Sequence, residues 1–327
     1  MIEVKQLTKC YDKGRVSALE DVSFKMRNRK IYGLLGPKGA GKSTVLGIMA
    51  GAVASTEGTV LINGYDICRQ PMEAKRQIGY LPEHPPVFKD MTPYEYLMFV
   101  ASVKGVKGET AVAQVKEALA VTDLASVEDH LICHLTPGCQ RRIGLAQALL
   151  GNPDVLILDE PLADLDPVRI AGIKSLIRKL GQTKTVIVSG HVLAEIKTFC
   201  DHIIILSEGK VVADDVPEVL EAGYGKNVIL SVTVQGDAPE VRRILCGLQG
   251  VQSVTELQAS GEEAVFRVVM DGALDAREAI VQAMTEAEFR VLRMDMKEQS
   301  LEDAFMTLSE QAEEVASADY EEEREAE

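Results

Sequence analysis

Long apolar runs, a secretion signal and cysteine pairs are all missing from this sequence of 327 residues. A helix that spans a bilayer needs about 18 or more mostly apolar residues, and the apolar run at residues 96–103 is far shorter. The first residues, MIEVKQL, lack the basic start and apolar stretch of a signal peptide. The six cysteines form no CxxC pair, which argues against a disulfide framework or a cysteine metal site. A cytoplasmic chain is therefore expected.

A strong positive charge is missing as well. The net charge is −15, and residues 301–327 alone hold eleven acidic residues and one basic residue, so the other 300 residues carry only −5. A body this close to neutral has no charge pattern for binding nucleic acid, and no nucleic-acid partner is expected. Residues 313–327 are expected to form a solvated, disordered acidic tail.

The sequence does contain several short apolar runs, each followed by a turn or a helical pattern. The runs at residues 30–36, 155–160, 185–190 and 202–209 are typical of buried strands in a mostly parallel sheet, which predicts an α/β domain. Apolar residues recur at helical spacing between them, which predicts a helical insert at about residues 85–150. This first domain is expected to cover residues 1–222.

A second, smaller domain is predicted at residues 226–312, after the turn-forming segment GYGKN. Apolar residues first alternate as in a strand, and the pattern then runs helix, strand, strand, helix, strand. That βαββαβ order is the order of a ferredoxin-like α+β domain. A last helix is expected to begin at Ser300, with Asp303 as its capping partner.

A phosphate-binding loop is predicted at residues 36–44, where GPKGAGKST matches the pattern GxxxxGK[ST] in full. It follows an apolar strand and precedes a helical segment, so backbone N–H groups and the helix dipole can face phosphate oxygens. Lys42 is expected to reach the outer phosphates and Ser43 to offer a hydroxyl to Mg²⁺, while Lys38 either leans on phosphate or is solvated. The expected nucleotide-binding residues of this loop are Gly36, Pro37, Lys38, Gly39, Ala40, Gly41, Lys42, Ser43 and Thr44.

Two carboxylates end the apolar run VLILDE at residues 155–160. Neighbouring residues at a strand end point in different directions, so one carboxylate can face a metal and the other a nucleophile. Asp159 is expected to hold the Mg²⁺ shell through water. Glu160 is expected to accept a proton from the attacking water, or to orient that water.

These motifs, together with LTPGCQRRIGLAQALL before the carboxylates and PLADLDP and VIVSGH after them, resemble the nucleotide-binding subunit of an ABC (ATP-binding cassette) transporter. The resemblance covers residues 2–220. It implies a P-loop NTPase fold with a mostly parallel core, an antiparallel β subdomain and a helical subdomain. It also implies that the chain binds ATP and Mg²⁺, hydrolyses ATP, and dimerises on ATP to power a membrane permease from the inner face of the membrane.

The resemblance also implies roles for four further residues. Tyr11 should stack on adenine, Asp166 should lie in the D-loop at the dimer seam, and His191 should contact the γ-phosphate. Glu83 stands where most relatives carry a glutamine near the metal, so it offers an oxygen ligand but adds charge.

The signature loop, LSGGQ in most relatives, is altered here to LTPGC at residues 135–139. By resemblance, Thr136 and Gly138 should complete the ATP site of the opposite subunit. Pro137 removes an N–H donor and Cys139 replaces the glutamine, but proline is tolerated in the first turn of a helix. Weakened rather than abolished activity is expected. The second subunit is either an identical chain or a relative.

Within the family, IGYLPEHPPVF and the trailing α+β domain resemble exporters of the multidrug and gliding-motility type. By the same resemblance, residues 85–100 are expected to form the docking surface for the permease, although about half of their apolar side chains could instead fill the core of the helical insert.

A soluble ABC ATPase that acts on ribosomes or DNA is the alternative, but such proteins usually carry two cassettes or a long coiled coil, and neither is present. A P-loop kinase would leave LTPGC, Glu160 and His191 without a role.

Deleting residues 313–327 is expected to change the melting temperature by less than about 2 °C and to leave the ATPase rate close to that of the full chain. A segment this charged and this poor in large apolar side chains cannot bury much surface. Thermal unfolding and steady-state ATPase assays of the two chains test this. A large fall in melting temperature would mean that the tail packs on the folded part.

Overall fold

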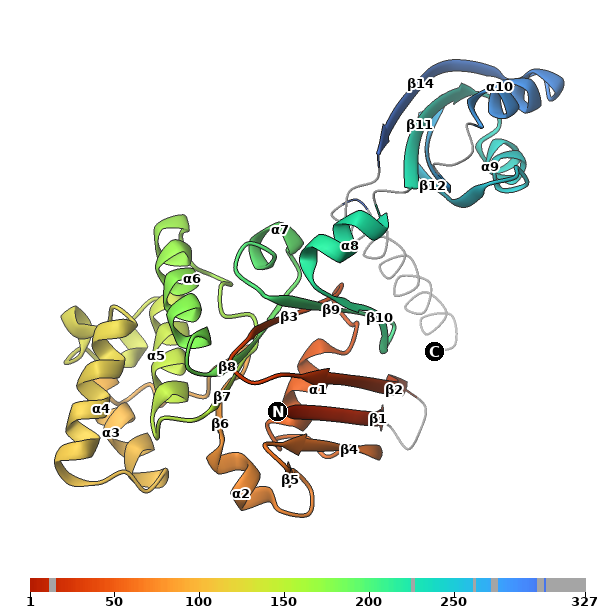
Figure 1. Cartoon of the computed structure of the whole chain (residues 1–327). Coiled ribbons are helices and arrows are strands. Elements are labelled where there is room, and N and C mark those ends of the chain that lie inside the picture. The colour runs from red at the N-terminus through yellow and green to blue at the C-terminus, as the bar shows by residue number, and fades with distance from the viewer. Residues whose placement is uncertain (12–15, 225–226, 261–262, 272–275, 299–302, 304–327) are drawn as a thin grey trace, which may run out of the picture. The chain divides into compact units, whose positions relative to one another are not determined.

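The computed structural model describes residues 1–11, 16–224, 227–260, 263–271, 276–298 and 303. The chain divides between Pro217 and Glu218 into two compact units (Figure 1). The acidic tail and, apart from Asp303, the helix expected from Ser300 lie outside the described residues.

The centre of the first unit is a six-stranded sheet with the strand order β10-β9-β3-β8-β7-β6. All neighbouring strands in it are parallel except β9 and β10. The inner strands are buried on both faces, as parallel sheets covered by helices require. The mostly parallel core is thus confirmed. The strands are β3 (Ile31–Leu35), β6 (Ile78–Leu81), β7 (Val155–Leu158), β8 (Thr185–Gly190), β9 (His202–Ser207) and β10 (Lys210–Asp215).

An antiparallel sheet forms a second layer, with the order β2-β1-β4-β5. Helix α1 (Lys42–Met49) lies between the two sheets (Figure 1), and its apolar residues share one buried cluster with residues of both. The helix that follows the phosphate loop is therefore fixed from two sides. The strands of this layer are β1 (Ile2–Tyr11), β2 (Val16–Met26), β4 (Glu57–Ile62) and β5 (Tyr65–Asp66), and α2 (Pro71–Arg76) follows them.

The expected helical subdomain is present and has its own buried cluster. Its first long helix begins with a capping box, in which Thr92 and Glu95 each satisfy the other's backbone N–H. Its elements are α3 (Pro93–Val103), α4 (Gly108–Val121), the short 3₁₀ helices Ala125–Val127 and Ile132–His134, and α5 (Pro137–Leu149). The helices α6 (Pro167–Gly181), α7 (Leu193–Ile196) and α8 (Pro217–Tyr224) follow later in the chain. Among the described residues, none of the helices has the length and apolar character that crossing a membrane requires.

Helix α5 lies directly against the parallel sheet. A Cβ atom at Gly79 of β6 would stand 2.0 Å from the carbonyl oxygen of Ala148 in α5, and one at Gly144 would stand 2.6 Å from Pro85. Glycine at both positions therefore allows the helix backbone to approach the strand. This contact fixes α5 next to the end of β7, where the two carboxylates lie.

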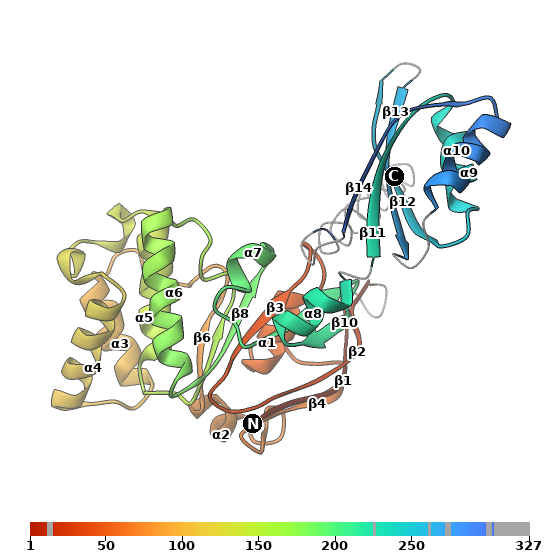
Figure 2. The ribbon, with the colours of Figure 1, turned by 45° about the horizontal axis from the view of Figure 1, so that its top comes forward.

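The second unit is a four-stranded antiparallel sheet with the order β12-β13-β11-β14. Its two helices pack on one face of the sheet (Figure 2), around a core that includes Phe266 and Leu245. Strand order and connections are those of a ferredoxin-like domain, as predicted. The elements are β11 (Asn227–Gln235), α9 (Ala238–Cys246), β12 (Val251–Ser260), β13 (Glu263–Asp271), α10 (Arg277–Glu286) and β14 (Arg290–Glu298).

The substitution Gly79→Ala is expected to destabilise the protein by about 1–3 kcal/mol or more, because the new methyl group must push α5 away from β6. The matched control is Gly172→Ala in α6, where a Cβ would meet no atom within 4 Å. In that position alanine should stabilise the helix by up to about 1 kcal/mol. Urea unfolding of both variants measures the two effects. Equal effects of the same sign would contradict the close approach.

Candidate functional site

The phosphate loop connects β3 to α1. Gly39 and Gly41 have φ angles of 79° and 96°, in the left-handed region that favours glycine. A Cβ at Gly36 would stand 2.3 Å from the carbonyl oxygen of Leu206, so the loop also passes close to β9. These glycines let the loop fold tightly over the start of α1, where free N–H groups can meet an anion.

The Lys42 side chain is buried beneath this loop, with its residue only 8% exposed. Its ammonium group donates hydrogen bonds to the carbonyl oxygens of Gly36 and Pro37, each at 2.8 Å. Burial lowers the pKa of Lys42, and the carboxylates of Glu160, Asp159 and Glu83 oppose that effect. The cation is therefore held inside the loop by groups that a phosphate oxygen can replace.

Asp159 follows β7 and is the most deeply buried carboxylate of the site, at 1% exposure. Its Oδ1 accepts a hydrogen bond of 2.6 Å from the Ser189 hydroxyl, and the Ser43 hydroxyl lies near enough to act on its pKa. Burial raises the pKa of Asp159, whereas the two hydroxyls act to lower it. Ser43 and Asp159, both expected to serve a metal, thus lie near each other.

Glu160 and His191 form a second pair. The Nδ1 atom of His191 lies 3.1 and 3.2 Å from the two carboxylate oxygens of Glu160. The pair brings together residues that follow two adjacent parallel strands, β7 and β8. Glu160 has a left-handed backbone with φ 48°, and its N–H donates to Ser189 Oγ at 2.7 Å. Ser189 therefore bridges the Asp159 carboxylate and the Glu160 backbone, a contact that the sequence analysis missed.

These groups meet at a cavity of about 670 Å³. Several predicted residues line it, namely Lys38, Gly39, Gly41, Lys42, Ser43, Thr44, Glu83, Glu160 and His191. Of the other predicted loop residues, Gly36 and Pro37 contact Lys42, and Ala40 is buried behind the loop. Residues not predicted also line it, namely Ala18, His84, Arg141, Ala163 and Asp164.

Besides Gly36, Pro37, Ala40 and the buried Asp159, four predicted residues do not line this cavity: Tyr11, Thr136, Gly138 and Asp166. Tyr11 ends β1 with 40% of its surface exposed, and the Lys9 ammonium lies 4.7 Å from its ring centre. Asp166 caps α6 by accepting a hydrogen bond from the Arg169 N–H at 3.0 Å. Tyr11 is thus available at the surface for an external group, and Asp166 sits at a helix start.

The altered signature loop still begins a regular helix. Thr136 is the N-cap of α5, with its hydroxyl accepting from the Cys139 N–H at 3.3 Å, and Pro137 occupies the first turn as expected. The Cys139 thiol is turned inward, 3.2 Å from the Arg142 guanidinium. Burial opposes ionisation of this thiol, but hydrogen bonds with Thr136 and Arg142 outweigh it and lower its pKa.

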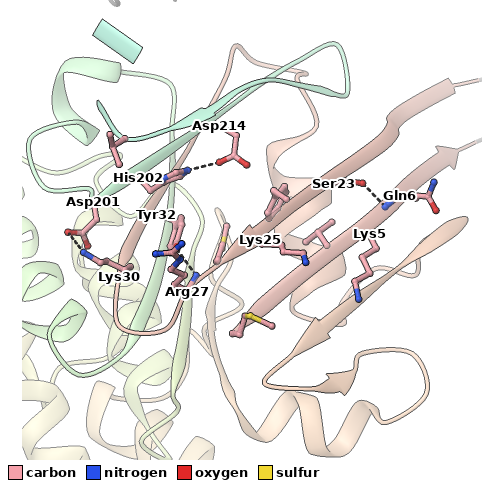
Figure 3. Close-up of a pocket in the computed structure, with 15 residues that line it drawn as sticks. Lys5, Gln6, Ser23, Lys25, Arg27, Lys30, Tyr32, Asp201, His202 and Asp214 are labelled. Carbon is pink, nitrogen blue, oxygen red and sulfur yellow. Dashed lines mark hydrogen bonds and ion pairs between the residues drawn. The ribbon is translucent and has the colours of Figure 1, made fainter. Parts of the chain in front are cut away.

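A larger cavity of about 1020 Å³ lies elsewhere, between β1 and β2 on one side and β3, β9 and β10 on the other (Figure 3). It contains none of the predicted residues. Several of its polar groups are already paired: His202 with Asp214 at 2.6 Å, and the Arg27 N–H with the Tyr32 hydroxyl at 2.6 Å. No glycine among the described residues lines it, whereas Gly39 and Gly41 of the phosphate loop line the smaller cavity.

Comparison with known proteins agrees with this geometry. Residues 19–163 match the family model described as ABC transporter. The chain is 33% identical over 314 residues to the uncharacterized ABC transporter ATP-binding protein YhcH of Bacillus subtilis, covering 94% of this chain and 96% of that protein. It is 34% identical over 222 residues to the lipopolysaccharide export system ATP-binding protein LptB of Haemophilus influenzae, covering 67% of this chain and 91% of that protein.

A solved structure is similar as well. It is described as a dimeric post-hydrolysis state of the ATP-binding cassette MJ0796 bound to ADP and Pi, and it matches with a TM-score of 0.62 and 28% identity. The match covers 66% of this chain and 98% of that one. Motifs, site geometry and relatives agree: the chain belongs to the ABC transporter family as an ATP-binding subunit that hydrolyses ATP to power transport.

Proposed function

We propose that this chain is the ATPase of an exporter, and that it works as one of two nucleotide-binding subunits attached to a permease at the inner face of the membrane. The observation that carries the proposal is the convergence of Lys42, Ser43, Glu160 and His191 on one cavity above a buried Asp159. The full-length likeness to one ABC protein, and the export system named for another, support it.

The phosphate loop would hold the nucleotide phosphates. Backbone N–H groups at residues 36–44 and the Lys42 ammonium would bind the outer phosphate oxygens, and Lys38 adds a second cation at the same cavity. The exposed ring of Tyr11 would stack on adenine.

Mg²⁺ fits the oxygen groups beside this loop. The Ser43 hydroxyl lies near the buried Asp159 carboxylate, and Ser43 and Glu83 line the same cavity. Mg²⁺ prefers such oxygen ligands. When bound, the ion would neutralise charge that develops on the phosphates. Ser43 and Glu83 would hold it directly, and Asp159 would hold it through water.

Hydrolysis would depend on Glu160. Its carboxylate borders the cavity, so it can accept a proton from a water placed next to the outer phosphate, or orient that water. His191 would fix the rotamer of Glu160 and contact the γ-phosphate. Because both Glu160 oxygens lie near Nδ1 of His191, the carboxylate is held before substrate arrives.

The second half of each site would come from the partner subunit. Thr136 and Gly138 start α5, and the N-terminus of a helix attracts the negative charge of a phosphate. Asp166 would lie at the seam, and ATP would be sandwiched between the two subunits. The dimeric state of the MJ0796 cassette supports this arrangement.

Residues 85–100 would form the docking surface for the permease. Within this segment Tyr96 and Leu97 are buried in the helical subdomain, whereas Phe88 and Phe99 are 46% and 45% exposed. The rings of Phe88 and Phe99 lie 5.6 Å apart, and Phe88 also packs edge-on against Tyr96. A rigid, exposed aromatic pair of this kind suits an apolar helix of a partner.

We further propose that residues 1–222 form the ATPase domain, that residues 226–312 form an accessory domain, and that residues 313–327 form a solvated tail. No relative named above points to ribosomes or DNA, so the soluble alternative has no support from them.

The variant Glu160→Gln is expected to bind ATP while hydrolysis falls by a factor of about 10²–10⁴, because the amide keeps the size but cannot accept the proton. Trapped ATP should then hold two subunits together. Size-exclusion chromatography with light scattering, with ATP, with ADP and without nucleotide, measures the dimer. Full ATPase activity in this variant would refute the role of Glu160. Loss of hydrolysis without a dimer would point to a different partner chain.

The double variant Phe88→Ser/Phe99→Ser is expected to lose its permease while the isolated subunit keeps its basal ATPase rate within about twofold, since both rings lie outside the phosphate cavity. Co-purification from detergent-solubilised membranes measures the loss. Met72→Ser, at a residue 62% exposed in α2, is the matched control and should keep the permease. Equal capture by both variants would exclude this docking surface.

A further inference from the structure

Arg141 makes two contacts that no nucleotide-binding motif accounts for. It lies in α5, and its side chain is only 8% exposed. One guanidinium nitrogen donates to the backbone carbonyl oxygen of Glu160 at 2.8 Å, and the other donates to Asp164 Oδ2 at 3.0 Å. The buried guanidinium of Arg141 therefore connects α5, the helix that begins at the signature loop, to both ends of the segment 160–164.

The backbone of that segment needs to be held. Glu160 and Asp164 have φ angles of 48° and 61°, a left-handed conformation that residues other than glycine seldom adopt without support. Ser189 Oγ accepts from the Glu160 N–H at 2.7 Å, and Arg141 donates to the Glu160 carbonyl. The peptide groups on both sides of the Glu160 side chain are thus fixed, which sets the direction of its carboxylate.

The hydrogen bond from Arg141 to the Glu160 carbonyl is stronger than the ion pair between Arg141 and Asp164. The Asp164 side chain is 60% exposed, so solvent screens its attraction to the guanidinium. The carbonyl of Glu160 accepts a charge-assisted hydrogen bond from a side chain that is nearly fully buried.

We propose that Arg141 is a positioning residue for ATP hydrolysis. It holds the Glu160 backbone so that the carboxylate faces the phosphate cavity, and this inference rests on the role proposed above for Glu160. Gly138 brings the start of α5 close to the segment 160–164 as well, because a Cβ atom at Gly138 would stand 3.0 Å from the Asp164 carbonyl oxygen. One rigid helix therefore places both the signature loop and the catalytic carboxylate of the same chain.

The first test compares Arg141→Gln with wild type. Glutamine is too short to reach the Glu160 carbonyl, so kcat should fall by about 10- to 100-fold, the order of loss expected when a reacting group is misplaced by about 1 Å. KM for ATP should stay within about twofold, because the phosphate loop is unchanged. Arg178→Gln is the matched control, since Arg178 also donates to a backbone carbonyl, that of Thr198 at 2.8 Å, and it should keep wild-type kcat.

The second test is a double-mutant cycle with Glu160→Gln. If Arg141 acts through the Glu160 carboxylate, Arg141→Gln should cause no further loss once that carboxylate is gone. Arg141→Lys, which keeps a cation and one donor, should recover most of the wild-type kcat. If circular dichroism shows that Arg141→Gln does not fold, the same double-mutant cycle is measured with Arg141→Lys. A fall in kcat of about threefold that disappears in the Glu160→Gln background would support the proposal.

The outcomes separate two failures. If Glu160→Gln alone leaves hydrolysis intact, the proposed role of Glu160 is wrong. Two other results would show that Arg141 does not position Glu160. In the first, Glu160→Gln abolishes hydrolysis but Arg141→Gln keeps kcat within twofold, and in the second, the losses of the two single variants multiply in the double variant. In both cases the function proposed above still stands.

Discussion

The buried carboxylate of Asp159 is the constraint around which the site is built. A charge at 1% exposure must be solvated by the protein, and hydroxyls of Ser189 and Ser43 do this. Ser43 lies in the first turn of α1 and Ser189 lies in β8, so meeting this need fixes the phosphate loop against the sheet. Ser189 then also accepts from the Glu160 N–H. One hydroxyl thereby contacts both the Asp159 carboxylate and the backbone of the residue proposed for catalysis.

The cavity is lined by cations and by carboxylates in equal number, namely Lys38, Lys42 and Arg141 with Glu83, Glu160 and Asp164. The carboxylates of Glu160, Asp159 and Glu83 all act to raise the pKa of Lys42, against the effect of burial. A magnesium–nucleotide complex would bring both a dication and phosphate anions. The cation would meet the carboxylates, while the phosphates would meet Lys42, Lys38 and the start of α1. The geometry thus favours binding the two together over binding either alone.

The features that could be predicted from the sequence are those that lie in one continuous segment and those that follow from the order of strands in a parallel sheet. The phosphate loop is a continuous pattern, and Glu160 and His191 follow adjacent parallel strands, so their meeting could be expected. The ferredoxin-like order was likewise readable from alternation. Ser189 and Arg141 were missed because their contacts depend on how α5 and β8 pack, and an ordinary serine or arginine in a sequence carries no such signal. The close approach of α5 to Gly79 could not be predicted from the sequence for the same reason.

The altered signature loop illustrates how packing limits the effect of substitution. Pro137 removes one N–H, but it stands in the first turn, where that group has no partner within the helix. Cys139 points into the protein toward Arg142, so it does not take over the donors of the glutamine it replaces. What remains at the surface is the Thr136 hydroxyl. It accepts from the Cys139 N–H and still has its own proton to donate, and a phosphate oxygen is a suitable acceptor. The seam would therefore depend more on that hydroxyl and on the helix dipole than it does in relatives that keep the glutamine.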